Sequence, residues 1–107
     1  MAARRPLARR EIDLYRLFSN CRYGMTPQAL RRKYLVSNLQ IARIARVSEP
    51  TVERWFSSGA NRSHPNATQL LMLGLMDLLW EHYEEIPTDL RELVCPPPNG
   101  ASSSQTE

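Results

Sequence analysis

Residues 48–57, SEPTVERWFS, carry side chains that can hydrogen-bond to the edges of nucleic-acid bases. The guanidinium group of Arg54 can donate two parallel hydrogen bonds to O6 and N7 of guanine, a contact worth about 1 to 3 kcal/mol of discrimination. The carboxylates of Glu49 and Glu53 can accept a hydrogen bond from N4 of cytosine. This segment nevertheless has two acids and one basic residue, so it would hold a polyanion only weakly by itself.

A helix through this segment sorts its side chains into two faces. Helical periodicity places Val52, Trp55 and Phe56 on an apolar inner face, so we expect the rings of Trp55 and Phe56 to pack in the core rather than stack on bases. The predicted base-reading face holds the remaining positions, Ser48, Glu49, Pro50, Glu53, Arg54 and Ser57. The alternative for the two glutamates is that they are solvated helix residues, with Glu49 also stabilised by the helix dipole.

The charges divide along the chain. Residues 1–62 hold 13 Arg and Lys against four acids, whereas residues 63–107 hold one arginine, Arg91, against seven acids. A basic half favours an anionic partner such as nucleic acid, and the acidic half should then lie on the far side. The alternative is a solvated surface with an uneven charge distribution.

Affinity for a polyanion must come from outside residues 48–57. Basic residues flank this segment on both sides, and a polar residue at the start of the preceding helix can bind a phosphate together with free backbone amides. The predicted phosphate-binding residues are Asn38, Arg43, Arg46, Thr51, Arg62 and His64. The N-terminal arm RRPLARR, residues 4–10, either adds contacts to nucleic acid or is a solvated terminus.

Helix signals dominate the elements that must position these residues, and no segment alternates with the period of two of a half-buried strand. The N-cap residues Thr26, Ser37, Ser48 and Asn66 mark helix starts, with a capping box in the sequence SNLQ. We predict an all-α fold: a compact bundle of about five short helices containing a helix-turn-helix, with an extra N-terminal helix.

The predicted organisation is one domain with two appendages. Residues 1–24 form an N-terminal basic arm and helix, with the helix running from about Pro6 to Asn20, and residues 95–107 form a disordered tail. The domain between them, residues 25–94, contains the helix-turn-helix and then a long apolar helix at residues 67–85.

Residues 38–57 fit the twenty-position helix-turn-helix template for physical reasons. Two helices that cross closely need a small residue, supplied by Ala42, and apolar contacts, supplied by Ile41, Ala45, Val47, Val52 and Trp55. The turn often carries glycine where this chain has Arg46. It therefore either holds a non-glycine residue at positive φ or has a shape that does not need one.

The sequence QIARIARVSEPTVERWFSSG resembles the helix-turn-helix of the lambda-repressor-like, or Cro/C1-type, family. The shared features are a valine-serine turn, a threonine-valine pair, and a tryptophan followed by a loop that contains glycine. The resemblance covers about residues 25–85 and implies a bundle of about five helices that binds DNA. This chain departs from the family at Arg46 and in lacking a basic recognition helix.

The long helix is too apolar for one stripe facing one small core, since nearly all residues from Leu70 to Trp80 are apolar. Either the bundle and the N-terminal helix cover it on two sides, or one side forms a dimer interface, as when two half-sites are read together. We favour a homodimer. Its predicted interface residues are Leu75, Leu78, Leu79 and Trp80.

Other classes of protein have little support in the sequence. No apolar run is long enough to span a membrane or to form a signal peptide, so we expect a cytoplasmic protein with no membrane partner. Cys21 and Cys95 predict reduced thiols, and the spacing of His64 and His82 predicts no metal site. No catalytic motif occurs, so neither an enzyme nor a cofactor is expected.

The sequence thus predicts a small, repressor-like transcription regulator that binds specific sequences of double-stranded DNA. The alternative is a non-enzymatic protein-interaction module, or an antitoxin-like adaptor. Such a protein would use the helix-turn-helix as a scaffold and bind a protein partner through its apolar and acidic C-terminal helix.

Overall fold

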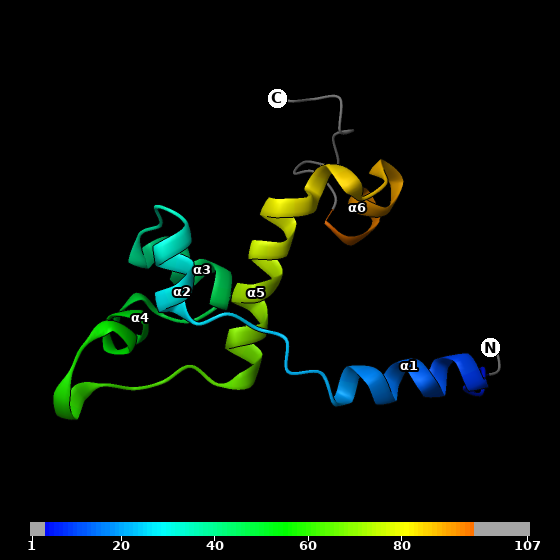
Figure 1. Cartoon of the computed structure of the whole chain (residues 1–107), viewed down its shortest axis with the longest axis horizontal. Helices are drawn as coiled ribbons and strands as arrows, with labels where there is room; N and C mark the ends of the chain where they lie inside the picture. Colours follow the sequence, from blue (N-terminus) through cyan, green and yellow to red (C-terminus); the bar gives the residue numbers. More distant parts are fainter. Residues whose placement is uncertain (1–3, 96–107) are drawn as a thin grey trace.

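The computed structural model describes residues 4–95, and all regular structure in this range is helical. The all-α prediction is thereby confirmed for these residues, with six α-helices rather than about five. In chain order the elements are α1 (Arg9–Ser19), α2 (Pro27–Lys33), α3 (Asn38–Ala45), α4 (Glu49–Phe56), the 3₁₀ turn η1 (Gly59–Asn61), α5 (Ala67–His82), the 3₁₀ turn η2 (Tyr83–Glu85) and α6 (Thr88–Val94) (Figure 1). The predicted disordered tail lies outside the described residues except for Cys95, as do residues 1–3 of the predicted arm.

Four helices begin at the predicted N-caps. The side-chain oxygens of Thr26, Ser37, Ser48 and Asn66 each accept a hydrogen bond from the backbone N–H three residues later. At Ser37 the capping box is complete, because the Gln40 side chain accepts from the Ser37 N–H at 2.9 Å. These bonds pair N–H groups that a helix leaves free at its start.

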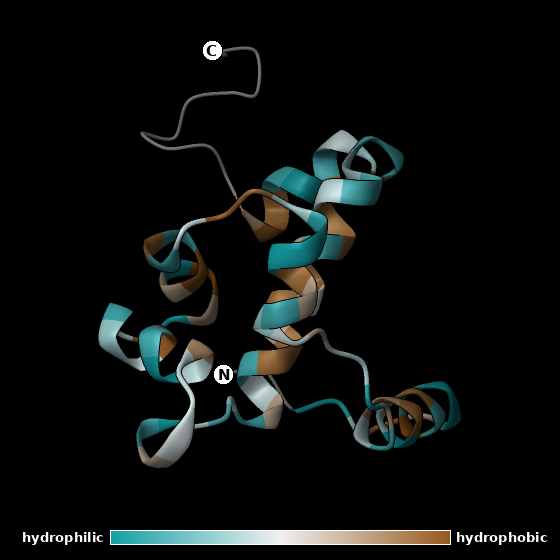
Figure 2. Cartoon of the chain, turned by 60° about the vertical axis from the view of Figure 1, so that its left-hand side comes forward, coloured by the Kyte–Doolittle hydropathy of each residue, from teal (hydrophilic) through white to brown (hydrophobic). Residues whose placement is uncertain are grey.

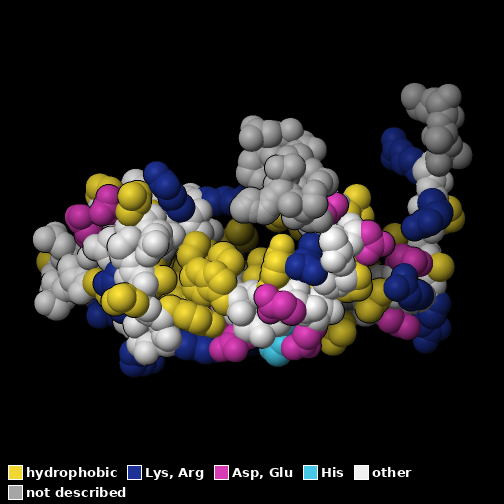
Figure 3. All heavy atoms as spheres, turned by 90° about the horizontal axis from the view of Figure 1, so that it is seen from above, with side chains coloured by type: hydrophobic (Ala, Val, Ile, Leu, Met, Phe, Trp, Pro, Cys, Tyr) yellow, Lys and Arg dark blue, Asp and Glu magenta, His cyan; other side chains and the backbone are white. Residues whose placement is uncertain are grey.

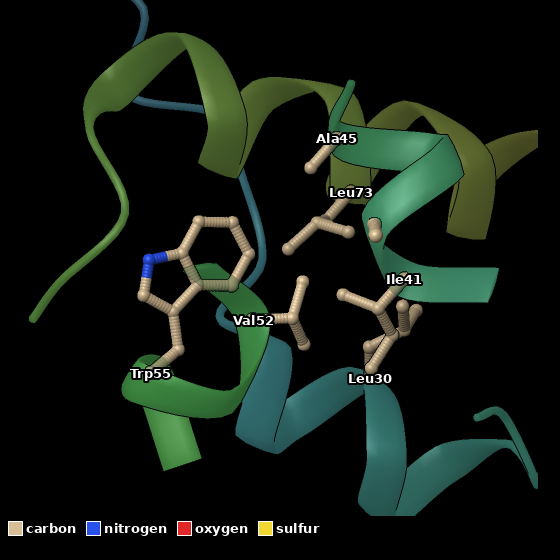
Figure 4. Close-up of a cluster of buried hydrophobic side chains, with 7 residues drawn as sticks. Leu30, Ile41, Ala45, Val52, Trp55 and Leu73 are labelled. Carbon is tan, nitrogen blue, oxygen red and sulfur yellow. The ribbon is translucent and has the colours of Figure 1, made fainter. Parts of the chain in front are cut away.

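Helices α2 to α5 enclose the hydrophobic core. Its side chains converge from all four helices in Figure 4, with Trp55 on one side and Leu30 and Ile41 on the other. Among residues 4–95, the buried core cluster consists of Leu30, Ile41, Ala42, Ala45, Val52, Trp55 and Leu73. The core thus fixes α4 against α2 and α3, as the apolar inner face predicted.

Helix α1 stands away from this bundle, in both Figure 1 and Figure 2. It begins at Arg9 rather than near Pro6, and none of its residues is buried. Leu17 and Phe18 keep 70% and 69% of their surface exposed. The extra N-terminal helix therefore exists, but it adds nothing to the core.

Helix α5 is covered on two sides. Leu73 faces the core, and the linker between α1 and α2 crosses a second side. The hydroxyl of Tyr23 donates to the carbonyl of Gly74 at 2.7 Å, and the N–H of Met25 donates to the carbonyl of Leu70 at 3.0 Å. The linker, rather than the N-terminal helix considered above, thus provides the second cover.

The linker can cross α5 closely because each segment has a glycine at the crossing, Gly24 in the linker and Gly74 in α5. A Cβ atom on Gly74 would lie 3.0 Å from the Cα of Gly24, and one on Gly24 would lie 3.1 Å from the backbone of Leu70. The helix continues to His82, and the last three residues of the predicted range form η2.

A cluster of polar side chains joins the basic α2 region to the acidic α5. The ammonium of Lys33 lies 2.8 Å from the carboxylate of Asp77 and 2.6 Å from that of Glu81. The hydroxyl of Tyr34 donates to Asp77 at 2.7 Å, and its ring packs on Trp80 with centroids 4.6 Å apart. The hydrogen bond from Lys33 lowers the pKa of Asp77, and burial with the bond to Asp77 raises the pKa of Tyr34 to about 12.

None of the helices within residues 4–95 has the length and apolar character needed to cross a lipid bilayer.

Candidate nucleic-acid interface

The turn between α3 and α4 is held by a left-handed residue. Arg46 has φ 63° and ψ 47°, and the N–H groups of Arg46 and Val47 both donate to the carbonyl of Ala42. This pattern closes a helix C-terminus where glycine is usual. Of the two possibilities that the sequence left open, the structure has a non-glycine residue at positive φ.

The inner face of α4 is fixed in the core. Val52 and Trp55 are 0% and 1% exposed. The end of the helix is tied down by two further contacts: the amide of Gln28 donates to the carbonyl of Trp55 at 2.9 Å, and the N–H of Ser63 donates to the carbonyl of Arg54 at 3.2 Å. The outward face of α4 is therefore held in one orientation relative to the bundle.

The predicted base-reading side chains lie together on this outward face or at its ends. Glu49, Pro50, Glu53 and Arg54 are exposed. The two predicted serines lie at the ends of the helix: Ser48 is the exposed N-cap, and the hydroxyl of half-buried Ser57 donates to the carbonyl of Arg54 at 3.0 Å. Four exposed side chains thus form the centre of the face, and each serine also has a structural hydrogen bond.

The Arg54 side chain is oriented by its neighbours. Its Nη2 donates to Oγ1 of Thr51 at 3.2 Å, and that oxygen lies 2.8 Å from Oγ of Ser48. This chain of bonds lays the guanidinium along the exposed face, toward the start of α4. It leaves the other N–H groups of Arg54 for an acceptor outside the protein. Thr51, a predicted phosphate ligand, is half-buried and serves here to hold Arg54.

Two predicted phosphate-binding arginines lie at opposite ends of α4. Arg46 is exposed in the turn before it. Arg62 is exposed after it, and the bond from Ser63 to Arg54 keeps this loop beside the helix end. His64, also exposed, follows in the same loop. The structure thus gathers Arg46, Arg54 and Arg62 around one helix.

Two other predicted phosphate ligands have different surroundings. Arg43 lines a groove with residues of α5 and the α2–α3 connection, among them Trp80 and Leu35, and none of the lining residues belongs to α4. Asn38 is half-buried, and its side-chain oxygen accepts a hydrogen bond from Arg31 at 2.6 Å. Arg43 thus contributes to a groove that α4 does not line, and the side-chain oxygen of Asn38 already has a partner in Arg31.

Two of the basic residues on α2 serve the fold rather than the surface. The guanidinium of Arg31 lies 4.0 Å from the centre of the Phe56 ring and bonds Asn38, so it connects α2, α3 and α4. Lys33 is paired with α5, as described above. The charge count of residues 1–62 included both among the cations that favour an anionic partner, because their contacts with other helices are not visible in the sequence. Arg32, between them, is exposed.

The predicted dimer-interface residues are partly exposed to solvent. Leu75, Leu78 and Trp80 are 39%, 43% and 42% exposed, and Leu79 is half-buried. Part of Trp80 is already covered by Tyr34. The leucines are therefore the better candidates for a further contact.

Within residues 4–95, no three His, Cys, Asp or Glu side chains lie close enough to hold a metal ion. Comparison with models of protein families, with curated proteins and with solved structures finds no match for this chain.

Proposed function

We propose that this protein is a small, non-enzymatic transcription regulator that binds double-stranded DNA and inserts α4 into the major groove. One observation carries the proposal: the inner face of α4 is locked in the core while its outer face is exposed and free of packing. In this reading α3, the Arg46 turn and α4 form a helix-turn-helix of the lambda-repressor-like type. A helix of this kind presents its outer side chains to base edges.

The proposal separates affinity from specificity. Arg46 and Arg62, at the two ends of α4, neutralise phosphates on either side of the groove, and this supplies most of the affinity. Arg54 donates to a base edge, with Glu53 on the same face as an acceptor for cytosine. The acidity of α4 is then compatible with DNA binding, because the positive charge comes from its flanks.

The affinity part can be tested with random duplex DNA at several salt concentrations. Arg46→Ala and Arg62→Ala should each weaken binding and reduce the slope of log K against log salt by about 1. Arg43→Ala removes the same charge from the groove beside Trp80 and is the matched control, with a smaller expected effect. Binding by the Arg46 and Arg62 variants as tight as that of the parent would refute the proposal.

The specificity part can be tested by selecting binding sites from a random duplex pool. Glu53→Ala should change the preferred bases at one position more than it changes overall affinity, since a base contact is worth about 1 to 3 kcal/mol of discrimination. A uniform change across all sequences would show that Glu53 reads no base.

We further propose that the regulator is a homodimer through the exposed leucines of α5. Two copies related by a two-fold axis would present two α4 helices to two half-sites, about one helical turn of DNA apart. Site selection would also report this spacing. The same exposed leucines support the second candidate, a protein-interaction module, which predicts a stable complex with a different protein and no salt-dependent DNA binding.

A further inference from the structure

Helix α1 has an apolar face that stays largely exposed among residues 4–95. Leu14, Leu17 and Phe18, at i, i+3 and i+4, are 47%, 70% and 69% exposed, and Leu7 before the helix is 59% exposed. Most protein–DNA contacts are made to phosphates, sugars and the polar edges of bases, which cover little of an apolar helix face. This face therefore calls for a protein partner, whatever the rest of the molecule binds.

A helix this short is not expected to be stable without cover. Isolated helices shorter than about 12 to 15 residues are marginal in water, and α1 has 11 residues. Because none of them is buried, tertiary packing within this chain does not supply the missing stability. Contact with another surface would.

The far side of α5 offers a matching surface. Leu75 and Leu78 are exposed there, and Leu71, four residues before Leu75, is half-buried. Leu71 and Phe18 line one cleft of about 560 Å³ between the end of α1 and the start of α5. The C-terminal end of α1 therefore lies beside the start of α5, whereas the rest of α1 extends away from the bundle (Figure 1).

The charges around these two faces are complementary. Residues 4–19 hold five arginines and two acids, and residues 77–92 hold six acids and one arginine. In the face shown in Figure 3, acidic side chains gather near the middle of the molecule and most Lys and Arg side chains lie toward its ends. Lys33 occupies Asp77 and Glu81, but Glu84 has no ion pair among the described residues, and neither has Asp89. An arm of opposite charge would find these carboxylates available.

We propose that α1 of one chain docks on the α5–α6 face of a second copy, and that the second copy returns the same contact. This inference rests on the proposed homodimer, and it names α1 as the segment that covers the exposed leucines of α5. Reciprocal exchange of an arm gives a closed two-fold dimer, in which each chain covers the apolar strip of the other.

The occupant is a second copy rather than the same chain or a lipid surface. In its own chain, α1 points away from α5 in both Figure 1 and Figure 2. A helix that binds anionic lipid is rich in basic residues on its polar face, whereas α1 also carries Glu11 and Asp13 there or beside it. The α5–α6 face supplies both the apolar strip and the opposite charge.

The test measures the molar mass of the full chain, 12.3 kDa as a monomer, by light scattering over a range of concentrations. Leu17→Glu with Phe18→Glu on α1, and separately Leu78→Glu on α5, should weaken dimerisation at least about tenfold, which corresponds to 1.4 kcal/mol. Asn61→Glu adds a charge at an exposed position of η1, outside α1, α5 and α6, and should leave the dimer intact. Because α1 buries no residue, its variants should keep the cooperative thermal unfolding of the α2–α5 bundle and should lose at most the helical circular dichroism signal of α1 itself.

A charge exchange makes the test specific to this contact. Arg9→Glu with Arg16→Glu, and Glu84→Lys with Asp89→Lys, should each weaken the dimer alone, and a mixture of the two variants should restore it as a heterodimer. Restoration would support docking between chains.

Three results would overturn the inference. If Leu78→Glu broke the dimer and the α1 variants did not, the homodimer would stand without arm exchange. If the parent chain were monomeric at all concentrations yet bound DNA, both the dimer and the arm exchange would fail while DNA binding remained. If α1 variants abolished binding to vesicles of anionic lipid and left the molar mass unchanged, α1 would be a membrane-binding helix.

Discussion

Arg46 combines a strained backbone with a proposed role in binding. A left-handed conformation costs an L-residue about 1 to 2 kcal/mol, and glycine adopts it without that cost. The chain nevertheless has arginine there, exposed and next to the start of α4. An arginine that contacts phosphate would explain why this position has not become glycine, the residue that the conformation itself favours.

Replacing Arg46 separates these two effects. Arg46→Gly should raise the free energy of unfolding by about 0.5 to 1 kcal/mol, after allowing for the greater freedom of glycine in the unfolded chain. The same variant should bind DNA more weakly. Urea denaturation and a salt-dependent binding assay measure the two quantities.

Arg46→Ala is the matched variant, because it removes the charge but keeps the strain. It should lose affinity without gaining stability. A glycine variant less stable than the parent would mean that the arginine side chain contributes packing that outweighs the strain.

At the scale of elements, α5 has a glycine, Gly74, in its interior, where helix propensity alone would favour another residue. Glycine in a helix interior costs about 1 kcal/mol relative to alanine. Here Gly74 lets the linker cross at contact distance and bond to its carbonyl through Tyr23. The linker crossing is thus part of the structure of α5 and fixes where α1 leaves the bundle.

Gly74→Ala should therefore destabilise the protein, although it improves helix propensity. Because the new Cβ would lie 3.0 Å from Gly24 Cα, the linker must move, and we expect a net loss of roughly 1 to 2 kcal/mol from overpacking. Thermal denaturation measures it. Thr68→Ala, at an exposed position of the same helix, should be neutral or slightly stabilising; a similar gain for Gly74→Ala would contradict the close crossing.

Features that depend on residues close together in the sequence could be predicted, whereas features that depend on contacts between distant residues could not. Ser37 and Gln40 are three residues apart, so their capping box could be read from the letters SNLQ. Helical periodicity likewise predicted that Val52 and Trp55 would be buried. The start of α1 was placed too early, because Pro6 permits a first helical turn but does not require one.

At the scale of the whole molecule, the basic and acidic halves of the sequence contact each other. Lys33 of α2 holds Asp77 and Glu81 of α5, so one contact joins the two halves inside the bundle. The partners are 44 and 48 residues apart in sequence. Nothing local to either segment could reveal the pairing, so the charge count of the basic half included Lys33 and Arg31 as if both were free.

This contact predicts a dependence of stability on pH. The pKa of Asp77 is lowered in the folded chain, chiefly by the hydrogen bond from Lys33, so its contribution is present above the unfolded value of about 3.9 and is lost as pH falls through the folded value. The parent should be more stable than Asp77→Asn at pH 7, and the difference should shrink as pH falls below about 4.

The measurement is the urea midpoint of both proteins between pH 7 and pH 3. Glu53→Gln, which removes one exposed carboxylate from α4, outside this cluster, is the control, and its midpoint should stay near that of the parent. A difference between parent and Asp77→Asn that stayed constant over this range would show that the carboxylate charge is not what stabilises the cluster.

The crossing of the linker over α5 also has a consequence for how the chain tolerates variation. In a library of all single substitutions selected only for folding, position 74 should accept almost nothing but glycine, whereas Leu17 and Phe18 should accept most residues. Selection for the assembled, working protein would add constraint only at positions that a partner covers. Positions that accept many residues when only folding is selected, but few when the working protein is selected, would therefore identify the residues that contact a partner.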